Sequence, residues 1–225
     1  MKLTVDAVVF SYIEGELKVL LIKRAFEPFK GQLALAGGYV QEDETTEQAV
    51  LRKLKDETGV NLDYLEQLYT FSDVERDPRG RIITVAYYGL IAPLKTEFTT
   101  NKHASDIGWY DPYDISFYGC GVAFDHMKII NYALGRLRNK IRYESIGFDL
   151  LPQYFTMTEL YMLYTSILEQ EIDRRNFLKK FKKFNLLKEA PFKNSTGGKG
   201  RKAQLYEFDE EKYLVLKRDG FNFDI

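Results

Sequence analysis

Apolar and polar positions in the first ninety residues change in short blocks, which is typical of strands separated by turns. β-Branched and other apolar residues fill 4–13 (TVDAVVFSYI) and 17–24 (LKVLLIKR), so both segments are predicted strands. The Glu14-Gly15-Glu16 turn between them favours a hairpin. Further predicted strands are a short QLALA segment, Tyr64–Asp73 and Arg81–Ile91, and a DPRGR turn joins the last two.

The polar segment 95–114 predicts a long loop, in which Trp109-Tyr110 begins a further strand. Long loops in compact domains often bind ligands, but this one offers weak candidates. His103 is a surface histidine by default, and no spacing requires Glu97 to act as a base.

Two helices are predicted in this half of the chain. The 37–60 segment, GGYVQEDETTEQAVLRKLKDETGV, passes from two glycines through an acidic loop into a helix that stops at Gly59. Residues 123–142 form the second, an amphipathic helix with apolar residues at helical spacing. His126 lies within it and is predicted to be a core or interface histidine.

The remaining residues predict a different unit. A capping box, Thr156-x-x-Glu159, begins a helix over 157–169, and Asp173 is the N-cap of a helix to Leu187. A strand (LLKEA), a Gly-rich loop (PFKNSTGGKGRK) and a strand (AQLYEF) follow. Two helices and a basic hairpin in this order predict a winged helix. Gly147 and Pro152 interrupt the pattern before it, so the predicted domains are 1–148 and 149–225.

The second of these helices has two chemically different faces. Phe177, Phe181 and Phe184 lie on one side, and basic residues lie on the other. A solvated basic helix or a membrane-surface helix would share this pattern, but the order of helices and hairpin favours double-stranded DNA. The predicted DNA-binding residues are Arg174, Arg175, Asn176, Lys179, Lys182, Lys183, Lys199, Arg201 and Lys202.

Charge supports this division. The net charge is −1, but 171–205 contain 11 basic and 3 acidic residues, which indicates an anionic partner for the second half. The single cysteine, Cys120, excludes an intrachain disulfide framework. No apolar run is long enough for a membrane span or a signal peptide, so we expect a cytoplasmic protein.

The 37–60 segment also carries candidate chemistry. Carboxylates at Glu44, Asp56 and Glu57 are suitable magnesium ligands, and Arg52 is placed to orient them, although an acidic helix is more often a solvated face. The full spacing resembles the Nudix box, G-x5-E-x7-R-E-U-x-E-E-x-G-U, where U is apolar. The positions in register are Gly38, Glu44, Arg52, Leu54, Glu57, Gly59 and Val60, with Asp56 in place of a Glu. Lys53 departs from the box, at the Glu that binds metal and often acts as the base.

RAFEPFKGQLALAGG resembles the approach to the Nudix box in enzymes that cleave ADP-ribose, except that Leu33 and Ala36 replace a Trp and a Pro. Together with the winged helix, and with AFDH, RLRNKIRYE, LLPQYFTMTEL and DRRNFLKKF, nearly the whole chain resembles the NrtR-type Nudix-related transcriptional regulators. The resemblance implies an α+β fold: a Nudix α/β/α sandwich with a mixed sheet, then a C-terminal winged helix-turn-helix domain. It also implies homodimers on palindromic operators, and an effector that is ADP-ribose or, in a pentose-sensing (arabinose) branch, a pentose or pentose phosphate.

The favoured function is therefore a ligand-responsive repressor that requires no cofactor. The alternative is an active magnesium-dependent Nudix hydrolase of ADP-ribose or a related nucleoside diphosphate. Lys53 favours the repressor, because an ammonium placed where the cation should sit weakens any magnesium site at Asp56 and Glu57, and it can pair with Glu57. Arg24, Glu44 and Arg52 are the predicted ligand-binding residues.

Overall fold

The computed structural model describes residues 1–62, 64–93, 98, 104–193 and 203–221, with only the backbone described at 116, 117 and 191–193. It separates into two compact units, Met1–Ile13 with Leu17–Arg136, and Glu14–Glu16 with Leu137–Ile225. The two units therefore divide between Arg136 and Leu137, inside a helix. The domain boundary between 148 and 149 stays a prediction. In the described part of the chain, no helix has the length and apolar character needed to cross a bilayer.

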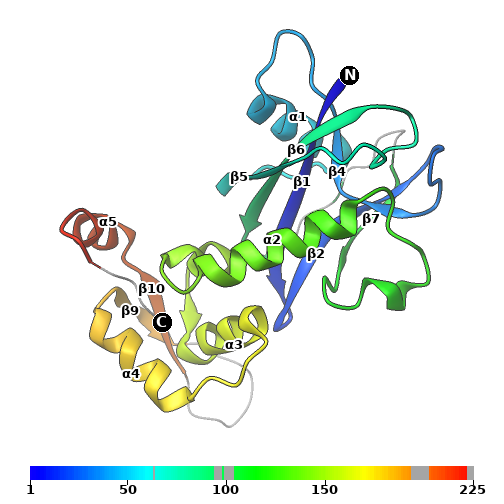
Figure 1. Ribbon diagram of the computed structural model, residues 1–225. Coiled ribbons are helices and arrows are strands. Elements are labelled where there is room, and N and C mark those ends of the chain that lie inside the picture. The colour runs from blue at the N-terminus through cyan, green and yellow to red at the C-terminus, as the bar shows by residue number, and fades with distance from the viewer. Residues whose placement is uncertain (63, 94–97, 99–103, 194–202, 222–225) are drawn as a thin grey trace. The chain divides into compact units, whose positions relative to one another are not determined.

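The first unit is built on one mixed sheet (Figure 1). Its central strands, β1 and β6, run parallel with Val5 opposite Val85. The pairs β1–β4, β2–β3, β2–β7 and β5–β6 are antiparallel. The strands are β1 (Lys2–Ile13), β2 (Glu16–Arg24), β3 (Leu33–Ala34), β4 (Ala36–Tyr39), β5 (Tyr64–Phe71), β6 (Ile82–Ile91) and β7 (Ala104–Tyr110). Neighbouring β1 and β2 confirm the predicted hairpin.

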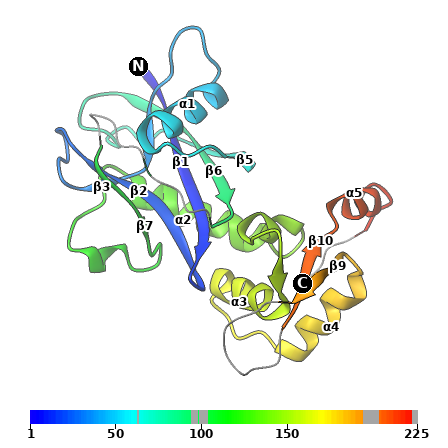
Figure 2. The ribbon, with the colours of Figure 1, turned by 180° about the vertical axis from the view of Figure 1, so that it is seen from behind.

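Helices α1 (Thr46–Thr58) and α2 (His126–Lys140) cover opposite faces of this sheet, as the front and rear views show (Figures 1 and 2). Residues of β1 are buried on both faces for this reason: Val5, Ala7 and Val9 join the core that includes α1, while the alternate residues Val8 and Phe10 are equally buried. The predicted α/β/α sandwich with a mixed sheet is confirmed.

Helix α1 ends where its sequence predicts, and its first turn is capped. Thr45 Oγ1 accepts from the Gln48 N–H at 3.2 Å, and Gln48 Oε1 accepts from the Thr45 N–H at 2.9 Å, which completes a capping box. Gly59 ends the helix in the left-handed conformation, at φ 78°. Between these ends Ala49, Val50 and Leu54 are buried.

Three predicted elements differ from the structure. The helix predicted to reach Leu187 ends at Phe184, because Asn185 adopts the left-handed conformation. The other two lie in the first unit. Within 95–114, strand β7 occupies Ala104–Tyr110 and pairs with β2, so Trp109-Tyr110 end a strand instead of beginning one. The polar composition of this segment did not indicate a strand. Among the described strands β7 pairs with β2 alone, and it exposes Ser105 and Asp106. Helix α2 begins at His126, later than 123, because Phe124 adopts φ 55°, which is incompatible with a helix.

The second unit confirms the winged helix. A short 3-10 turn, η2 (Ser145–Leu150), precedes α3 (Met157–Leu168) and α4 (Arg174–Phe184), whose N-caps are Thr156 and Asp173. Strands β8 (Phe155–Thr156), β10 (Gln204–Phe208) and β9 (Leu187–Lys193) form an antiparallel sheet in that order. A further helix, α5 (Glu210–Arg218), follows the sheet. In the first unit, η1 (Ile115–Tyr118) lies before α2.

Candidate functional site

The first unit contains a cavity of about 390 Å³. Its lining residues come from strands β1, β2 and β4, helix α1, the segment after β2, the turn before β6 and the start of α2. The residues that line it are Thr4, Asp6, Ile22, Arg24, Phe26, Glu27, Leu35, Gly37, Gly38, Tyr39, Lys53, Glu57, Arg76, Asp77, Arg79, Phe124 and His126. Four basic and four acidic side chains face a volume of the size usual for small-molecule sites.

Two glycines in β4 allow the close packing at one wall. A Cβ on Gly37 would lie 2.3 Å from the Val5 carbonyl oxygen and 2.5 Å from Asp6 Oδ1, so only glycine fits beside β1. A Cβ on Gly38 would lie 2.6 Å from Lys53 Cε and 2.9 Å from Lys53 Nζ. The Lys53 side chain therefore extends from α1 across the face of β4 into the space that Gly38 leaves.

Glu57 lies one helical turn after Lys53 and is 5 % exposed. Its Oε2 accepts from the Gly37 N–H at 3.1 Å. Burial raises the pKa of Glu57 to about 7, against the opposing effects of the Gly37 hydrogen bond and of Lys53. Among the described residues Lys53 itself forms no ion pair, so the predicted pairing with Glu57 is not formed.

Three other charged residues of the 37–60 segment, Glu44, Arg52 and Asp56, pair with one another. Arg52 donates to both oxygens of Glu44, with Nε 2.8 Å from Oε2, and its Nη1 lies 3.9 Å from Asp56 Oδ2. These hydrogen bonds lower the pKa of Glu44 to about 2. Arg52 thus orients carboxylates as predicted, but neither Glu44 nor Arg52 is among the residues lining the cavity, whereas Arg24 is.

Arg24 and Arg79 both approach the ring of Phe124. Their guanidinium carbons lie 4.8 Å and 5.0 Å from its centroid, in the range of cation–π contacts. Arg79 is held by two hydrogen bonds to Asp77, and Arg24 Nε donates to the Pro28 carbonyl at 2.8 Å. Burial, and then the charge of Arg79, lower the pKa of Arg24. Two guanidinium groups beside one ring favour an anionic or aromatic ligand here.

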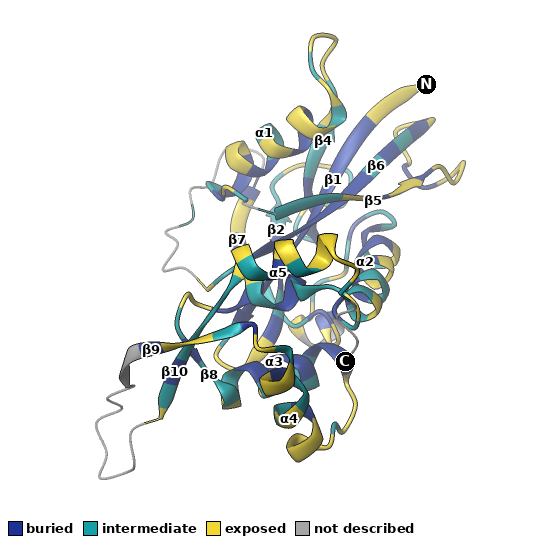
Figure 3. Ribbon diagram, turned by 90° about the vertical axis from the view of Figure 1, so that its left-hand side faces the viewer, coloured by how far each residue is buried: buried dark blue, intermediate teal, exposed yellow. Residues whose placement is uncertain are grey.

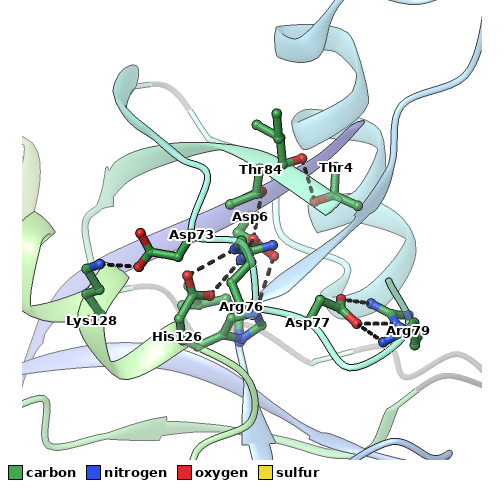
Figure 4. Close-up of polar contacts among 12 residues, drawn as sticks. Thr4, Asp6, Asp73, Arg76, Asp77, Arg79, Thr84, His126 and Lys128 are labelled. Carbon is green, nitrogen blue, oxygen red and sulfur yellow. Dashed lines mark hydrogen bonds and ion pairs between the residues drawn. The ribbon is translucent and has the colours of Figure 1, made fainter. Parts of the chain in front are cut away.

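A buried polar network underlies this cavity (Figure 4). Asp6 accepts from Thr84 Oγ1 at 2.7 Å and lies 3.5 Å from Arg76 Nη2. Arg76 donates two hydrogen bonds to Asp125, the residue before α2. His126 Nδ1 accepts from the Leu35 N–H at 2.9 Å, and its Nε2 lies 3.6 Å from Asp6 Oδ1. Burial lowers the pKa of His126, so the ring is held neutral.

The sequence identified only part of this site. His126 is the buried core histidine that its sequence predicts, but it also lines the cavity. The DPRGR turn predicted only a strand connection, yet it supplies Asp77 and Arg79. Phe124, in the AFDH segment, gave no signal of a binding role. His103 and Glu97 lie outside the described residues.

The second unit presents the predicted basic face on α4. Arg175, Asn176, Lys179, Lys182 and Lys183 are exposed while Phe177 and Phe181 are buried (Figure 3). Arg174 is also exposed, but its Nη2 donates to Thr158 Oγ1 at 3.0 Å and its guanidinium lies over the Tyr161 ring. Lys199, Arg201 and Lys202 lie outside the described residues.

Comparison with known families assigns both units. Residues 2–125 match the NUDIX domain, and residues 147–208 match the NrtR DNA-binding winged helix domain. A curated relative from Acinetobacter baylyi, the ADPR responsive transcriptional repressor NtrR, is 34 % identical over 215 residues, covering 94 % of this chain and 83 % of the relative. The chain belongs to the NrtR family.

Solved NrtR structures share this architecture. Shewanella oneidensis NrtR in complex with a 27mer DNA is 35 % identical, with a TM-score of 0.76, over 92 % of this chain and 93 % of that one. The NUDIX domain of the same NrtR in complex with ADP ribose is 41 % identical, with a TM-score of 0.56, over 61 % of this chain and 88 % of that one. The NrtR winged helix identifies the second unit as a DNA-binding one.

The carboxylates of the Nudix box in this NrtR-family chain lie in three different surroundings. Glu44 is bound by Arg52, and the side chain of Asp56 is 54 % exposed beside the same arginine. Glu57 is bonded to Gly37 beside Lys53. Among the described residues, no group of three or more His, Cys, Asp or Glu side chains is placed to hold a metal ion. The three carboxylates of the box are therefore not gathered around one point.

Proposed function

We propose that this chain is an ADP-ribose-responsive transcriptional repressor that binds operator DNA as a homodimer and requires no metal cofactor. The observation that carries the proposal is the NrtR winged helix, with the basic face of α4 exposed, in the same chain as a Nudix unit with a ligand-sized cavity. Two solved structures of relatives support this choice of ligands. One is NrtR in complex with DNA, and the other is an NrtR NUDIX domain in complex with ADP ribose.

The chemistry of the cavity supports ADP-ribose over a free pentose. Arg24, Arg79 and Lys53 provide cations for a diphosphate, and the Phe124 ring provides a surface on which an adenine can stack. A neutral pentose would bring no negative charge to Arg24 and Lys53. The free pentose is therefore the weaker proposal, and pentose and pentose phosphate are both arms of the test.

DNA recognition follows from α4. In a helix-turn-helix protein the second helix enters the major groove, so Arg175 and Asn176 near the start of α4 are placed to contact base edges. Lys179, Lys182 and Lys183 further along are suited to phosphates. Two copies would place their α4 helices in half-sites related by a two-fold axis, which predicts an inverted-repeat operator.

The test is selection of duplexes by the full chain from a random pool at moderate salt, followed by titration of the selected duplex. We expect one enriched inverted repeat, and a change in its Kd of about 5-fold or more when ADP-ribose is added. Failure to enrich any sequence would refute sequence-specific binding to DNA. Enrichment with a response only to ribose, arabinose or ribose 5-phosphate would refute ADP-ribose as the effector.

Hydrolysis is the second candidate, because a relative covering 52 % of this chain at 38 % identity is the ADP-ribose pyrophosphatase of Methanocaldococcus jannaschii. Incubation of the full chain with ADP-ribose and magnesium, with AMP measured by chromatography, distinguishes the two. We expect no AMP above the uncatalysed level. Magnesium-dependent AMP release that Glu57→Gln abolishes would establish an active hydrolase instead.

A further inference from the structure

Lys53 stands at the point of the Nudix box where the sequence reverses charge, and the structure shows where its ammonium lies. The side chain follows β4 over Gly38, since a Cβ at Gly38 would come within 2.9 Å of Lys53 Nζ. Lys53 lines the same cavity as Arg24 and Glu57. Its charge therefore acts inside the ligand cavity and not on the outer surface of α1.

The surrounding acids leave that ammonium available to a ligand. Both oxygens of Glu44 are bonded to Arg52, and Asp56 lies on the exposed side of α1. Glu57 uses one oxygen to accept from Gly37. A divalent cation in a phosphate site bridges oxygens of the ligand and neutralises them. A lysine ammonium offers three donors and one positive charge, without a metal.

We propose that Lys53 takes the place of the divalent cation: its ammonium binds the diphosphate of the effector directly, together with Arg24, so effector binding is independent of magnesium. The inference rests on the proposed ADP-ribose response. It assigns a positive role to a residue that would otherwise mark only the loss of a metal ligand.

The neighbouring Lys55 makes a matched control possible. Lys55 is exposed, does not line the cavity, and lies two residues from Lys53 on the same helix. Changing either lysine alters the net charge of the chain and the composition of α1 identically. A difference between the two positions therefore reports the cavity and not long-range charge or helix stability.

The experiment is calorimetric titration of the full chain with ADP-ribose, in EDTA and in excess magnesium. The wild-type Kd should agree in the two buffers within about 2-fold, far below the change that loss of one charge-assisted contact produces. Lys53→Met should raise the Kd about 10- to 100-fold in both buffers, while Lys55→Met leaves it unchanged. For ribose, the Lys53→Met effect should be absent.

Lys53→Glu restores the acidic residue of the box and provides the second variant. In EDTA it should bind ADP-ribose more weakly than Lys53→Met, because it adds repulsion, and magnesium should recover part of the loss. Lys55→Glu should show neither effect. Thermal unfolding of every variant checks that it is folded.

Different results would overturn the role of Lys53 and the choice of ADP-ribose as effector. Wild-type binding that needs magnesium, or Lys53→Met that binds ADP-ribose as well as wild type, overturns the role of Lys53 and leaves the ADP-ribose response intact. Absence of ADP-ribose binding in both buffers overturns the proposed effector, and this inference with it.

Discussion

Glu57 is the residue whose ionisation the fold controls most clearly. The carboxyl is buried against Gly37, and its pKa is about 7 instead of 4.5. A carboxyl with a raised pKa in the folded state contributes its full stability below the unfolded pKa and loses it as pH rises through the folded pKa. Its effect on stability therefore changes between about pH 4.5 and pH 7.

This gives a prediction for Glu57→Gln, which keeps the oxygen acceptor for Gly37 but cannot ionise. Between pH 4.5 and pH 8, the unfolding free energy of wild type should fall by about 3 kcal/mol relative to that of the variant. Urea unfolding in EDTA at several pH values measures this difference. A difference that stays constant with pH would show that burial does not raise the pKa of Glu57.

At the scale of elements, β4 depends on its two glycines for different reasons. Gly37 meets the backbone of β1, which has no room to move, whereas Gly38 meets the flexible end of Lys53. The same substitution at adjacent positions should therefore have separate consequences.

Gly37→Ala should destabilise the fold by about 1–3 kcal/mol, because the new methyl forces β4 away from β1. Gly38→Ala should cost less stability, but it should displace Lys53 and raise the Kd for ADP-ribose. Chemical denaturation and calorimetry measure the two quantities. Equal losses of stability at both positions would contradict the packing described for β4.

The exposed basic face of α4 leads to a second prediction at the scale of elements. Lys179→Ala should weaken binding to all duplexes similarly and reduce the slope of log K against log salt by about 0.9 for each bound copy. Lys55→Ala is the control, since Lys55 is exposed on α1 in the other unit. An unchanged slope would mean that Lys179 does not contact phosphate.

The extent to which sequence predicted these elements follows from the range of the interactions. Helix α1, its Gly59 stop and the winged helix are local patterns, and the sequence predicted each of them. The walls of the cavity formed by Arg79, Phe124 and His126 depend on segments distant in sequence. Phe124 illustrates the limit, because its left-handed backbone interrupts a continuous amphipathic pattern.

For the whole molecule, the proposed function joins an effector site and a DNA site in one chain, so their affinities are linked. If ADP-ribose changes the operator Kd by some factor, saturating operator must change the ADP-ribose Kd by the same factor. Titration of ADP-ribose into the chain with and without operator measures this reciprocity. Unequal factors would mean that a further equilibrium, such as dimer dissociation, contributes.

Two backbone amides at one wall of the cavity donate to ionisable side chains: Leu35 to His126 Nδ1 and Gly37 to Glu57 Oε2. Each proton can exchange with solvent only when its hydrogen bond opens. A ligand that tightens the cavity should therefore slow deuterium uptake at both amides, while neighbouring amides in the sheet change little. These two amides are built-in reporters of cavity opening, readable without altering any side chain.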